Sequence, residues 1–353
     1  MRAVPLVLAL VSLLTAQQPR LTNAKIETRA VTSGLDRWFR TIVASENGAA
    51  WIGYAIRAVS GEHQMCCYSS FEDSAGDRCC RGCALGGARS GVTVASTPGP
   101  VSLEASGYIF VLFRIEQHAV DRIRTFSADC ELDGGGLPIY WLTGVPAAES
   151  VALLSGFVTP TAAEHRQGEP AMAAIALHAD PAADVALEKL AVPGQPDSLR
   201  EKAVFWLGSA RGRRGLEVLR RIVTEDASDP VREKAVFGLS VSKEPEAIGV
   251  MIGVAKSDRS SHVRSQALFW LAHKAGQKAE AAITEAIEND PDTEVKKRAV
   301  FALQQLPPDE GVPLLIQVAR ANKNPAVRKQ AMFWLGQSND PRAVRFFEEV
   351  LLR

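Results

Sequence analysis

The sequence predicts a chain of two parts: an α-helical solenoid in the carboxy-terminal half, preceded by a small cysteine-containing domain of the α+β or mainly β class. Three observations support this prediction. A ten-residue pattern recurs at a fixed interval from residue 199 onward, short β-like runs occupy residues 25–145, and all six cysteines lie in that earlier region. The predicted boundaries are residues 17–146 for the first domain and 147–353 for the solenoid.

The recurring pattern consists of five segments that align without a gap, each beginning 32 residues after the one before. They read LREKAVFWLG, VREKAVFGLS, VRSQALFWLA, VKKRAVFALQ and VRKQAMFWLG, and they begin at Leu199, Val231, Val263, Val295 and Val327. A degenerate first unit precedes them between Ala171 and Leu190. Each period contains two segments with apolar residues at helical spacing, separated by polar or proline-containing breaks. One such helix pair cannot bury its apolar face alone, so neighbouring pairs are expected to stack.

The short form V-R-x-x-A-x-x-x-L-G, with Asp-Pro or Asn-Pro nearby, resembles the bacterial HEAT repeats also called PBS-lyase-like repeats. The resemblance covers residues 147–353 and implies a solenoid of stacked helix pairs. It implies no single activity, because such repeats occur in scaffolds, in regulators and in enzymes that attach bilin pigments. Export of the chain, argued below, disfavours the last of these.

Position six of the aligned segments, counted from zero at the first residue, is phenylalanine in all five repeats. A helix turns about 100° per residue, which places position six among the polar positions two and three and opposite the apolar positions zero, four and eight. An aromatic row on a polar face predicts a groove that binds apolar side chains of a partner protein or peptide. Sideways packing of each ring against the next repeat explains the row equally well. The candidate groove residues are Phe205, Phe237, Phe269, Phe301 and Phe333.

Positions one and seven also follow a rule. Position one is basic throughout, at Arg200, Arg232, Arg264, Lys296 and Arg328. The resemblance implies that these cations pair with acidic residues of the inter-repeat turns rather than bind nucleic acid, and Asp197, Asp229 and Asp292 lie just upstream as candidates. Position seven alternates between large and small, as Trp206, Gly238, Trp270, Ala302 and Trp334. We expect position seven to face the core, where large and small residues compensate each other's volume.

The amino-terminal domain is predicted from runs rich in aromatic and β-branched residues, bounded by Gly, Ser, Asp and Pro clusters. The runs are residues 51–59, 92–95, 108–116, 120–126 and 139–145. The short connection from Gln117 to Ala119 indicates a hairpin, and Leu35 to Val43 has the pattern of a helix.

The six cysteines are Cys66, Cys67, Cys79, Cys80, Cys83 and Cys130. In an exported protein an even number indicates disulfide bonds first, and six cysteines allow fifteen connectivities. The alternative is zinc, because Cys80 and Cys83 have the spacing of a zinc knuckle and two further cysteines would complete four ligands. Redox chemistry at Cys80 and Cys83 is a third alternative, although the thioredoxin-like motif belongs in a βαβ context that is not evident here.

The first sixteen residues have the features of a signal peptide. Arg2 supplies a positive start, Val4 to Leu14 form an apolar run too short to span a bilayer, and Thr15-Ala16 precede a polar segment. We therefore expect an exported protein, periplasmic or extracellular, with no membrane insertion after signal cleavage. Lys plus Arg equals Asp plus Glu at 40 each, which disfavours nucleic acid as a partner. The apolar residues near the chain end, from Phe346 to Leu352, suggest docking on a second copy or on the amino-terminal domain.

Catalytic motifs are not evident: the sequence has no glycine-rich phosphate loop, nucleophile elbow or HExxH string. The histidines are scattered, and those at positions 178, 262 and 273 fall near helix ends, where a solvated or capping role is expected. The sequence therefore predicts a non-enzymatic scaffold or adaptor that binds a partner on the solenoid groove and has no cofactor. The alternative is a metal-binding or redox-sensing cysteine domain carried on the solenoid.

Overall fold

The computed structural model describes residues 18–60, 83–85, 107–128, 131–159 and 164–352. The chain divides into two compact units, Met1–Pro181 (unit 1) and Ala182–Arg353 (unit 2). The predicted signal peptide and the β-like run at residues 92–95 lie outside the described residues. Within the ranges above, no helix is both long enough and apolar enough to cross a membrane.

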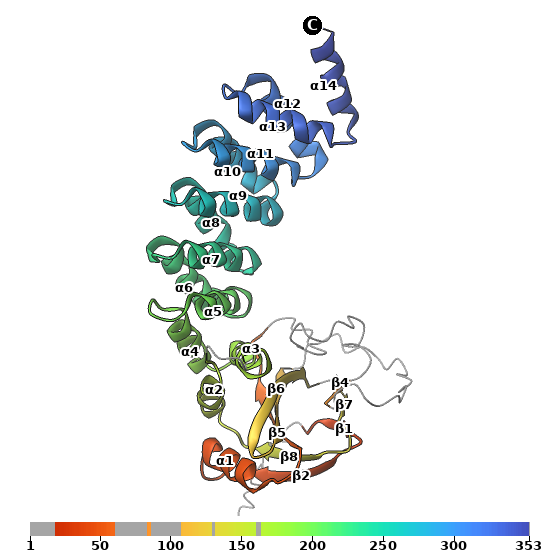
Figure 1. Cartoon of the computed structure of the whole chain (residues 1–353), viewed down its shortest axis with the longest axis vertical. Helices are drawn as coiled ribbons and strands as arrows, with labels where there is room; N and C mark the ends of the chain where they lie inside the picture. The colour runs from red at the N-terminus through yellow and green to blue at the C-terminus, as the bar shows by residue number, and fades with distance from the viewer. Residues whose placement is uncertain (1–17, 61–82, 86–106, 129–130, 160–163, 353) are drawn as a thin grey trace, which may run out of the picture. The chain divides into compact units, whose positions relative to one another are not determined.

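Unit 1 is built on a mixed five-stranded sheet with the order β2-β8-β3-β5-β6 (Figure 1). The strands are β2 (Lys25–Ala30), β3 (Ala50–Arg57), β5 (Tyr108–Glu116), β6 (Ala119–Ser127) and β8 (Pro138–Thr143). Strand β8 runs parallel to both β2 and β3, whereas β3, β5 and β6 form an antiparallel meander. A second, parallel sheet has the order β1-β7-β4, from β1 (Arg20–Thr22), β7 (Glu131–Asp133) and β4 (Cys83–Ala84).

Aromatic side chains form the core of unit 1 on both faces of the large sheet. On one face Trp51, Phe110 and Trp141 are buried in one cluster with Leu85 and Leu132, which follow β4 and lie in β7. On the other face lie α1 (Leu35–Ser45) and α2 (Ala147–Ser155); the ring of Phe39 from α1 meets that of Phe113 at a centroid distance of 4.8 Å. Gly53 is required between these layers, because an added Cβ would lie 2.9 Å from the Trp141 ring.

The predicted helix and hairpin of unit 1 are confirmed. Helix α1 covers the predicted residues and continues to Ser45. Strands β5 and β6 pair antiparallel across Gln117 and His118, which have φ angles of 52° and 58°. Two consecutive residues with positive φ are typical of the tight turn that matches the twist of a two-stranded ribbon.

The division between the units falls later than the predicted boundary at residues 146 and 147. Helix α2 and helix α3 (Glu169–Leu177), which the repeat resemblance included in the solenoid, lie within unit 1. Helix α3 and the π-helical turn η1 (Glu164–Gly168) pack against strand β6. Within unit 1, α3 also packs against α2.

A buried chain of hydrogen bonds joins β3, α2 and the end of α3. His178 Nδ1 lies 2.7 Å from the carbonyl oxygen of Ala174, so this nitrogen donates its proton. In the neutral ring Nε2 then accepts from the Ser150 hydroxyl at 2.8 Å, and Ser150 Oγ accepts from the Tyr54 hydroxyl at 2.7 Å. All three side chains are buried, and burial raises the pKa of Tyr54 well above its usual value. His178 is therefore buried rather than solvated, and its bond to the Ala174 oxygen at the carboxy-terminal end of α3 is the capping role that the sequence offered as the alternative.

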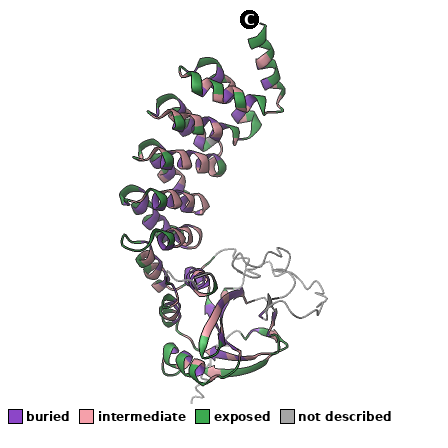
Figure 2. Ribbon diagram, viewed as in Figure 1, coloured by how far each residue is buried: buried purple, intermediate pink, exposed green. Residues whose placement is uncertain are grey.

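Unit 2 is a helical solenoid of two layers (Figure 1). The repeated segments lie in α5 (Asp197–Ala210), α7 (Asp229–Val241), α9 (Ser261–Ala275), α11 (Thr293–Gln304) and α13 (Pro325–Gly336). The helices that precede, separate and follow them are α4 (Ala182–Ala191), α6 (Gly212–Glu225), α8 (Ala247–Ser257), α10 (Gln277–Asn289), α12 (Pro308–Ala321) and α14 (Pro341–Leu351). Buried residues run along each helix on the side that faces the other layer, as Figure 2 shows, and positions zero, four and eight are buried as predicted.

Side chains at the repeat turns cap several of these helices. Asp292, Asn324 and Asp340 each accept a hydrogen bond from the backbone nitrogen two residues later. Proline occupies the first turn of α7, α13 and α14, where its missing N–H leaves no bond unmade. The pairs Asp229-Pro230, Asn324-Pro325 and Asp340-Pro341 therefore mark helix starts.

The cap of α14 gives a testable pH effect. Asp340 accepts from the backbone and from the guanidinium of Arg342, with Oδ2 and Nη2 2.6 Å apart, and Arg342 lowers the pKa of this carboxyl to about 2. Because folding lowers this pKa, the contact stabilises α14 fully at pH values above the usual pKa near 4. That stabilisation is lost as the pH falls through about 2. We expect an NMR titration of the Asp340 carboxyl to show a midpoint near 2. A midpoint near 4 would contradict the contact.

Candidate interaction surface

Eight aromatic rings form one unbroken row on the exposed side of the layer that contains α5, α7, α9, α11 and α13. We call this row the aromatic ladder. Each ring contacts the next with centroids 4.8–6.0 Å apart. Its members are Phe205, Trp206, Phe237, Phe269, Trp270, Phe301, Phe333 and Trp334. The structure thus brings all five candidate phenylalanines onto one surface; binding of a partner there stays a prediction.

The ladder has a period of two repeats. Phe205 stacks on Phe237 at 5.9 Å with an interplanar angle of 12°, and Phe269 stacks on Phe301 at 6.0 Å and 11°. Trp270 then contacts Phe237 at 4.8 Å and so joins the two stacked pairs. Trp334 makes the corresponding contact with Phe301 at 4.9 Å.

The alternation at position seven produces this period. Gly238 and Ala302 are buried, as predicted, and the backbone of Gly238 lies so close to α5 that an added Cβ on Gly208 would meet its carbonyl oxygen. The tryptophans are different: Trp206, Trp270 and Trp334 are only half-buried, and their rings lie against the phenylalanines. The prediction that these tryptophans face the core was wrong, because a long side chain at the border of the buried face reaches out over its small neighbour.

The ladder remains partly open to solvent. Phe205, Phe237, Phe269 and Phe301 are half-buried, and Phe333 exposes 52% of its surface. Both explanations of the phenylalanine row therefore contribute: the rings pack against neighbouring repeats and still present a face to the outside. Each phenylalanine contacts at least one neighbouring ring.

Charges beside the ladder change along its length. On α5 and α7, positions two and three are one acid and one base each, Glu201 with Lys202 and Glu233 with Lys234. The Lys234 ammonium lies 5.2 Å from the Phe237 ring centroid, a cation–π contact. On α11 and α13 the same positions hold three cations and a glutamine, namely Lys297, Arg298, Lys329 and Gln330.

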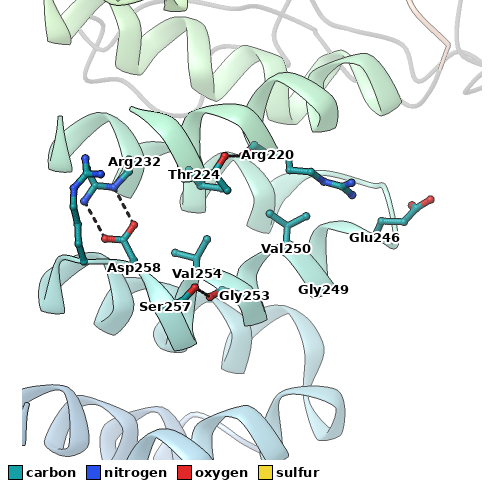
Figure 3. Close-up of a pocket in the computed structure, with 12 residues that line it drawn as sticks. Arg220, Thr224, Arg232, Glu246, Gly249, Val250, Gly253, Val254, Ser257 and Asp258 are labelled. Carbon is teal, nitrogen blue, oxygen red and sulfur yellow. Dashed lines mark hydrogen bonds and ion pairs between the residues drawn. The ribbon is translucent and has the colours of Figure 1, made fainter. Parts of the chain in front are cut away.

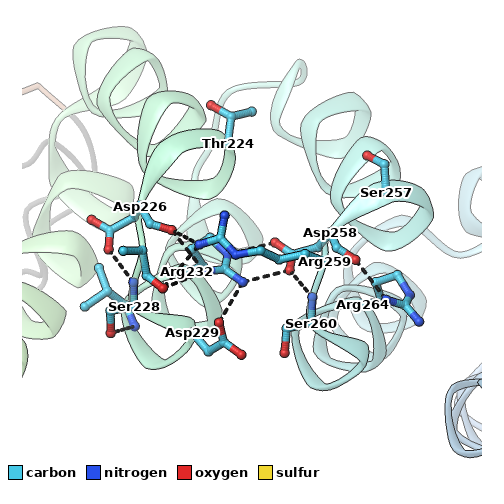
Figure 4. A network of polar contacts seen from close by, with 12 residues as sticks. Thr224, Asp226, Ser228, Asp229, Arg232, Ser257, Asp258, Arg259, Ser260 and Arg264 are labelled. Carbon is cyan, nitrogen blue, oxygen red and sulfur yellow. Dashed lines mark hydrogen bonds and ion pairs between the residues drawn. The ribbon is translucent and has the colours of Figure 1, made fainter.

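The arginines at position one of the first three repeats, Arg200, Arg232 and Arg264, form a second, buried array, which we call the ion-pair ladder; Figure 4 shows Arg232 and Arg264. Arg232 is 1% exposed and donates to both carboxylate oxygens of Asp258 at 2.9 Å and to the backbone oxygen of Asp226 at 3.0 Å. Arg264 binds Asp290 in the same way, and Arg200 pairs with Asp226. These carboxylates raise the pKa of Arg232 and Arg264.

The predicted partners of these cations were only partly right. Asp197 and Asp229 do contact Arg200 and Arg232, but both are about half exposed. The buried partner is instead the aspartate 26 residues further on, at the start of the next repeat. Asp292 does not hold Lys296; it caps α11. The structural role expected for these cations nevertheless fits the geometry, because their N–H groups donate to carboxylate and backbone oxygens of the solenoid.

The ion-pair ladder stops at the fourth repeat. Lysine replaces arginine at Lys296, and asparagine replaces aspartate at Asn322. Lys296 donates to the backbone oxygen of Glu288 at 2.7 Å, while the Asn322 amide donates to the Glu288 carboxylate at 3.2 Å. The contact between the last two repeats therefore lacks the buried ion pair of the earlier ones.

A pocket of about 590 Å³ lies between α6 and α8, in the other helix layer (Figure 3). Its apolar lining includes Val223, Val250 and Val254, and the exposed Arg220 lies at its border. Asp258 and Arg232 at one end of the pocket are bound to each other. The pocket therefore offers a ligand a mainly apolar surface whose buried charges are already neutralised.

The cysteine cluster is not placed by the structure. Cys66, Cys67, Cys79, Cys80 and Cys130 lie outside the described residues, and only the backbone of Cys83 is placed, in β4. Within the described ranges no three His, Cys, Asp or Glu side chains come together as a metal site. The disulfide and zinc hypotheses both stay predictions.

Comparisons with known proteins agree with the helical architecture. The family model described as HEAT repeats matches residues 280–353, whereas no curated protein sequence matches. Human deoxyhypusine hydroxylase in complex with glycerol is 17% identical, with a TM-score of 0.32 over 59% of this chain and 80% of that one. The complex of CpcE and CpcF of phycocyanin lyase from Nostoc sp. PCC7120 is 19% identical, with a TM-score of 0.25 over 54% and 98%. These scores are too low to carry an activity or a partner over to this chain. The HEAT-repeat model therefore matches the carboxy-terminal part of unit 2, and the earlier helix pairs from α5 to α9 stack in the same way.

Proposed function

We propose that this chain is an exported, non-enzymatic scaffold or adaptor that binds another protein on the aromatic ladder of its solenoid. Its repeats are proposed to be of the bacterial, PBS-lyase-like type, as the short V-R-x-x-A-x-x-x-L-G form suggests. One observation carries the proposal: eight aromatic rings in mutual contact stay partly exposed across five repeats.

Physical considerations favour binding at this surface. Aromatic side chains supply much of the energy of protein interfaces, since each buries a large area with few rotatable bonds. A contiguous apolar strip bordered by polar residues is typical of an interaction site on a soluble protein. Because each ring already contacts a neighbouring ring, ordering the rings on binding is expected to cost little conformational entropy.

The experiment is partner capture with matched variants. Phe333→Ser is chosen because its ring is half exposed and its described ring contact is with Trp334. Val344→Ser on α14 removes a side chain of similar exposure, 54%, away from the ladder. We expect proteins cross-linked from the native envelope fraction, and peptides selected from a random display library, to bind wild type and Val344→Ser but not Phe333→Ser. Equal capture by both variants, with unchanged melting temperatures, would remove the ladder as the binding surface.

Export is tested separately. Amino-terminal sequencing of the protein from the envelope fraction is expected to begin at Gln17, after cleavage behind Ala16. An intact Met1 on protein recovered from the cytoplasm would contradict export and leave the ladder unaffected.

A further inference from the structure

The spacing of the ladder restricts the shape of its occupant. Adjacent helices of the ladder layer pack directly against each other, which places their axes about 8–10 Å apart. A polyproline II helix has three residues per turn and a rise of about 3.1 Å, so a side chain returns to the same side about every 9.3 Å. A β-strand returns a side chain to one side about every 6.7 Å. One turn of polyproline II therefore matches one repeat, and a β-strand does not.

The continuity of the ladder argues against a helical occupant. Helices dock by inserting side chains into holes between the side chains of their partner. Here each ring touches the next at 4.8–6.0 Å, so the row is continuous and leaves no hole between one ring and the next. A continuous strip of ring faces and edges suits flat contacts, such as those of proline rings.

Charge determines the chemistry and the orientation of the occupant. Positions two and three of α11 and α13, next to Phe301 and Phe333, include Arg298 and Lys329. Both are exposed, and neither forms an ion pair with any residue that the structure describes. Lys297 beside them reaches Glu294 at the helix start. The same positions on α5 and α7 are balanced by Glu201 and Glu233. Carboxylates of a partner are therefore attracted to the end of the ladder formed by α11 and α13.

We infer that the ladder binds a proline-rich segment of a second protein in the polyproline II conformation, with acidic residues at the end that lies over α11 and α13. This inference rests on the proposed function and adds the chemistry of the partner. Polyproline II has no internal hydrogen bonds, so its carbonyl oxygens are free to accept from amide side chains such as Gln266 and Gln330, which occupy position three. Its stiffness keeps the entropy cost of binding low.

Labelled synthetic peptides test the inference by fluorescence anisotropy with the full chain. The probe is a peptide of five Glu-Pro-Pro triplets, one for each repeat. Five Lys-Pro-Pro triplets keep the conformation and reverse the charge, and five Glu-Gly-Ser triplets keep the charge and lose the conformation. The double variant Arg298→Glu, Lys329→Glu is matched by the double variant Arg213→Glu, Arg220→Glu, which makes the same charge change at two exposed residues of α6. We expect the probe to bind about tenfold more tightly than either altered peptide. We also expect about tenfold loss in Arg298→Glu, Lys329→Glu and in Phe333→Ser, with little loss in Arg213→Glu, Arg220→Glu and in Val344→Ser.

Three results would overturn the inference. Equal affinity for the Glu-Pro-Pro and Glu-Gly-Ser peptides would show that the polyproline II conformation is not recognised. Equal affinity for the Glu-Pro-Pro and Lys-Pro-Pro peptides would show that acidic residues are not recognised. Absence of probe binding at millimolar concentration would contradict both the conformation and the charge inferred for the partner. If the display library then still yields peptides that need Phe333, the proposed function stands and only the partner chemistry fails. If it yields none, the proposed function fails too.

Discussion

Replacing Asp258 by asparagine is expected to lower the free energy of unfolding of unit 2 by about 3 kcal/mol, because it removes the countercharge of a buried guanidinium. Asparagine keeps the shape of the side chain and its acceptor for the Ser260 backbone nitrogen, but its NH2 group replaces the oxygen that accepts from Arg232 Nε, so the loss reports the charge together with that hydrogen bond. Arg232 cannot turn to water without leaving its contacts with Asp226 and Ala227. Urea unfolding followed by circular dichroism, with hydrogen exchange of α7 to α9 to locate the change, gives the measurement.

The matched control for this prediction is Asp229→Asn. Asp229 contacts the same guanidinium at 2.8 Å but is half exposed, so water replaces it and the unfolding midpoint is expected to stay almost unchanged. If both variants lose the same stability, then the two carboxylates are equivalent and the buried pair has no special weight. If neither loses stability, the ion-pair ladder does not stabilise the solenoid.

Replacing Ser150 by alanine is expected to destabilise unit 1 by about 2–6 kcal/mol, since it removes the hydrogen-bond partner that Ser150 gives to two buried polar groups, at about 1–3 kcal/mol each. These groups are the Tyr54 hydroxyl and Nε2 of His178. The control is Ser155→Ala on the same helix, where the lost bond is an ordinary one to the Val151 oxygen. Hydrogen exchange of β3 and β5 measures the difference. Equal protection in the two variants would show that the buried chain is not needed to hold α2 against the sheet.

Much of this molecule could be predicted from local pattern. The period of the aligned segments gave the helix pairs, and alternation of aromatic and β-branched residues gave β3, β5, β6 and β8. Strand β2 was missed because KIETRA contains no apolar run and its strand lies at the edge of the sheet with exposed side chains. An edge strand is held by its backbone bonds to one neighbour, which leave little trace in the sequence.

The candidate surface could be predicted only in part, for geometric reasons. A helical wheel gives the direction of a side chain and therefore placed the phenylalanines correctly on one side. It does not give the reach of a side chain, so it missed that Trp270 extends to the Phe237 ring of the preceding repeat. For the same reason Asp229, three residues from Arg232, was predicted as its partner, although the buried partner is Asp258 in the following repeat.

The alternation of tryptophan with glycine or alanine has a consequence for how such a chain changes its length in evolution. Loss of one repeat, for example the one containing α9, would place Gly238 beside Ala302 and leave Phe237 without the tryptophan that covers it. Duplication of that repeat would set two tryptophans side by side, where one small residue now makes room for each. Gain or loss of two repeats preserves the alternation at position seven and the ring contacts of the aromatic ladder. The heritable unit of this solenoid is therefore a pair of repeats, and relatives with an intact ladder are expected to differ in length by even numbers of repeats.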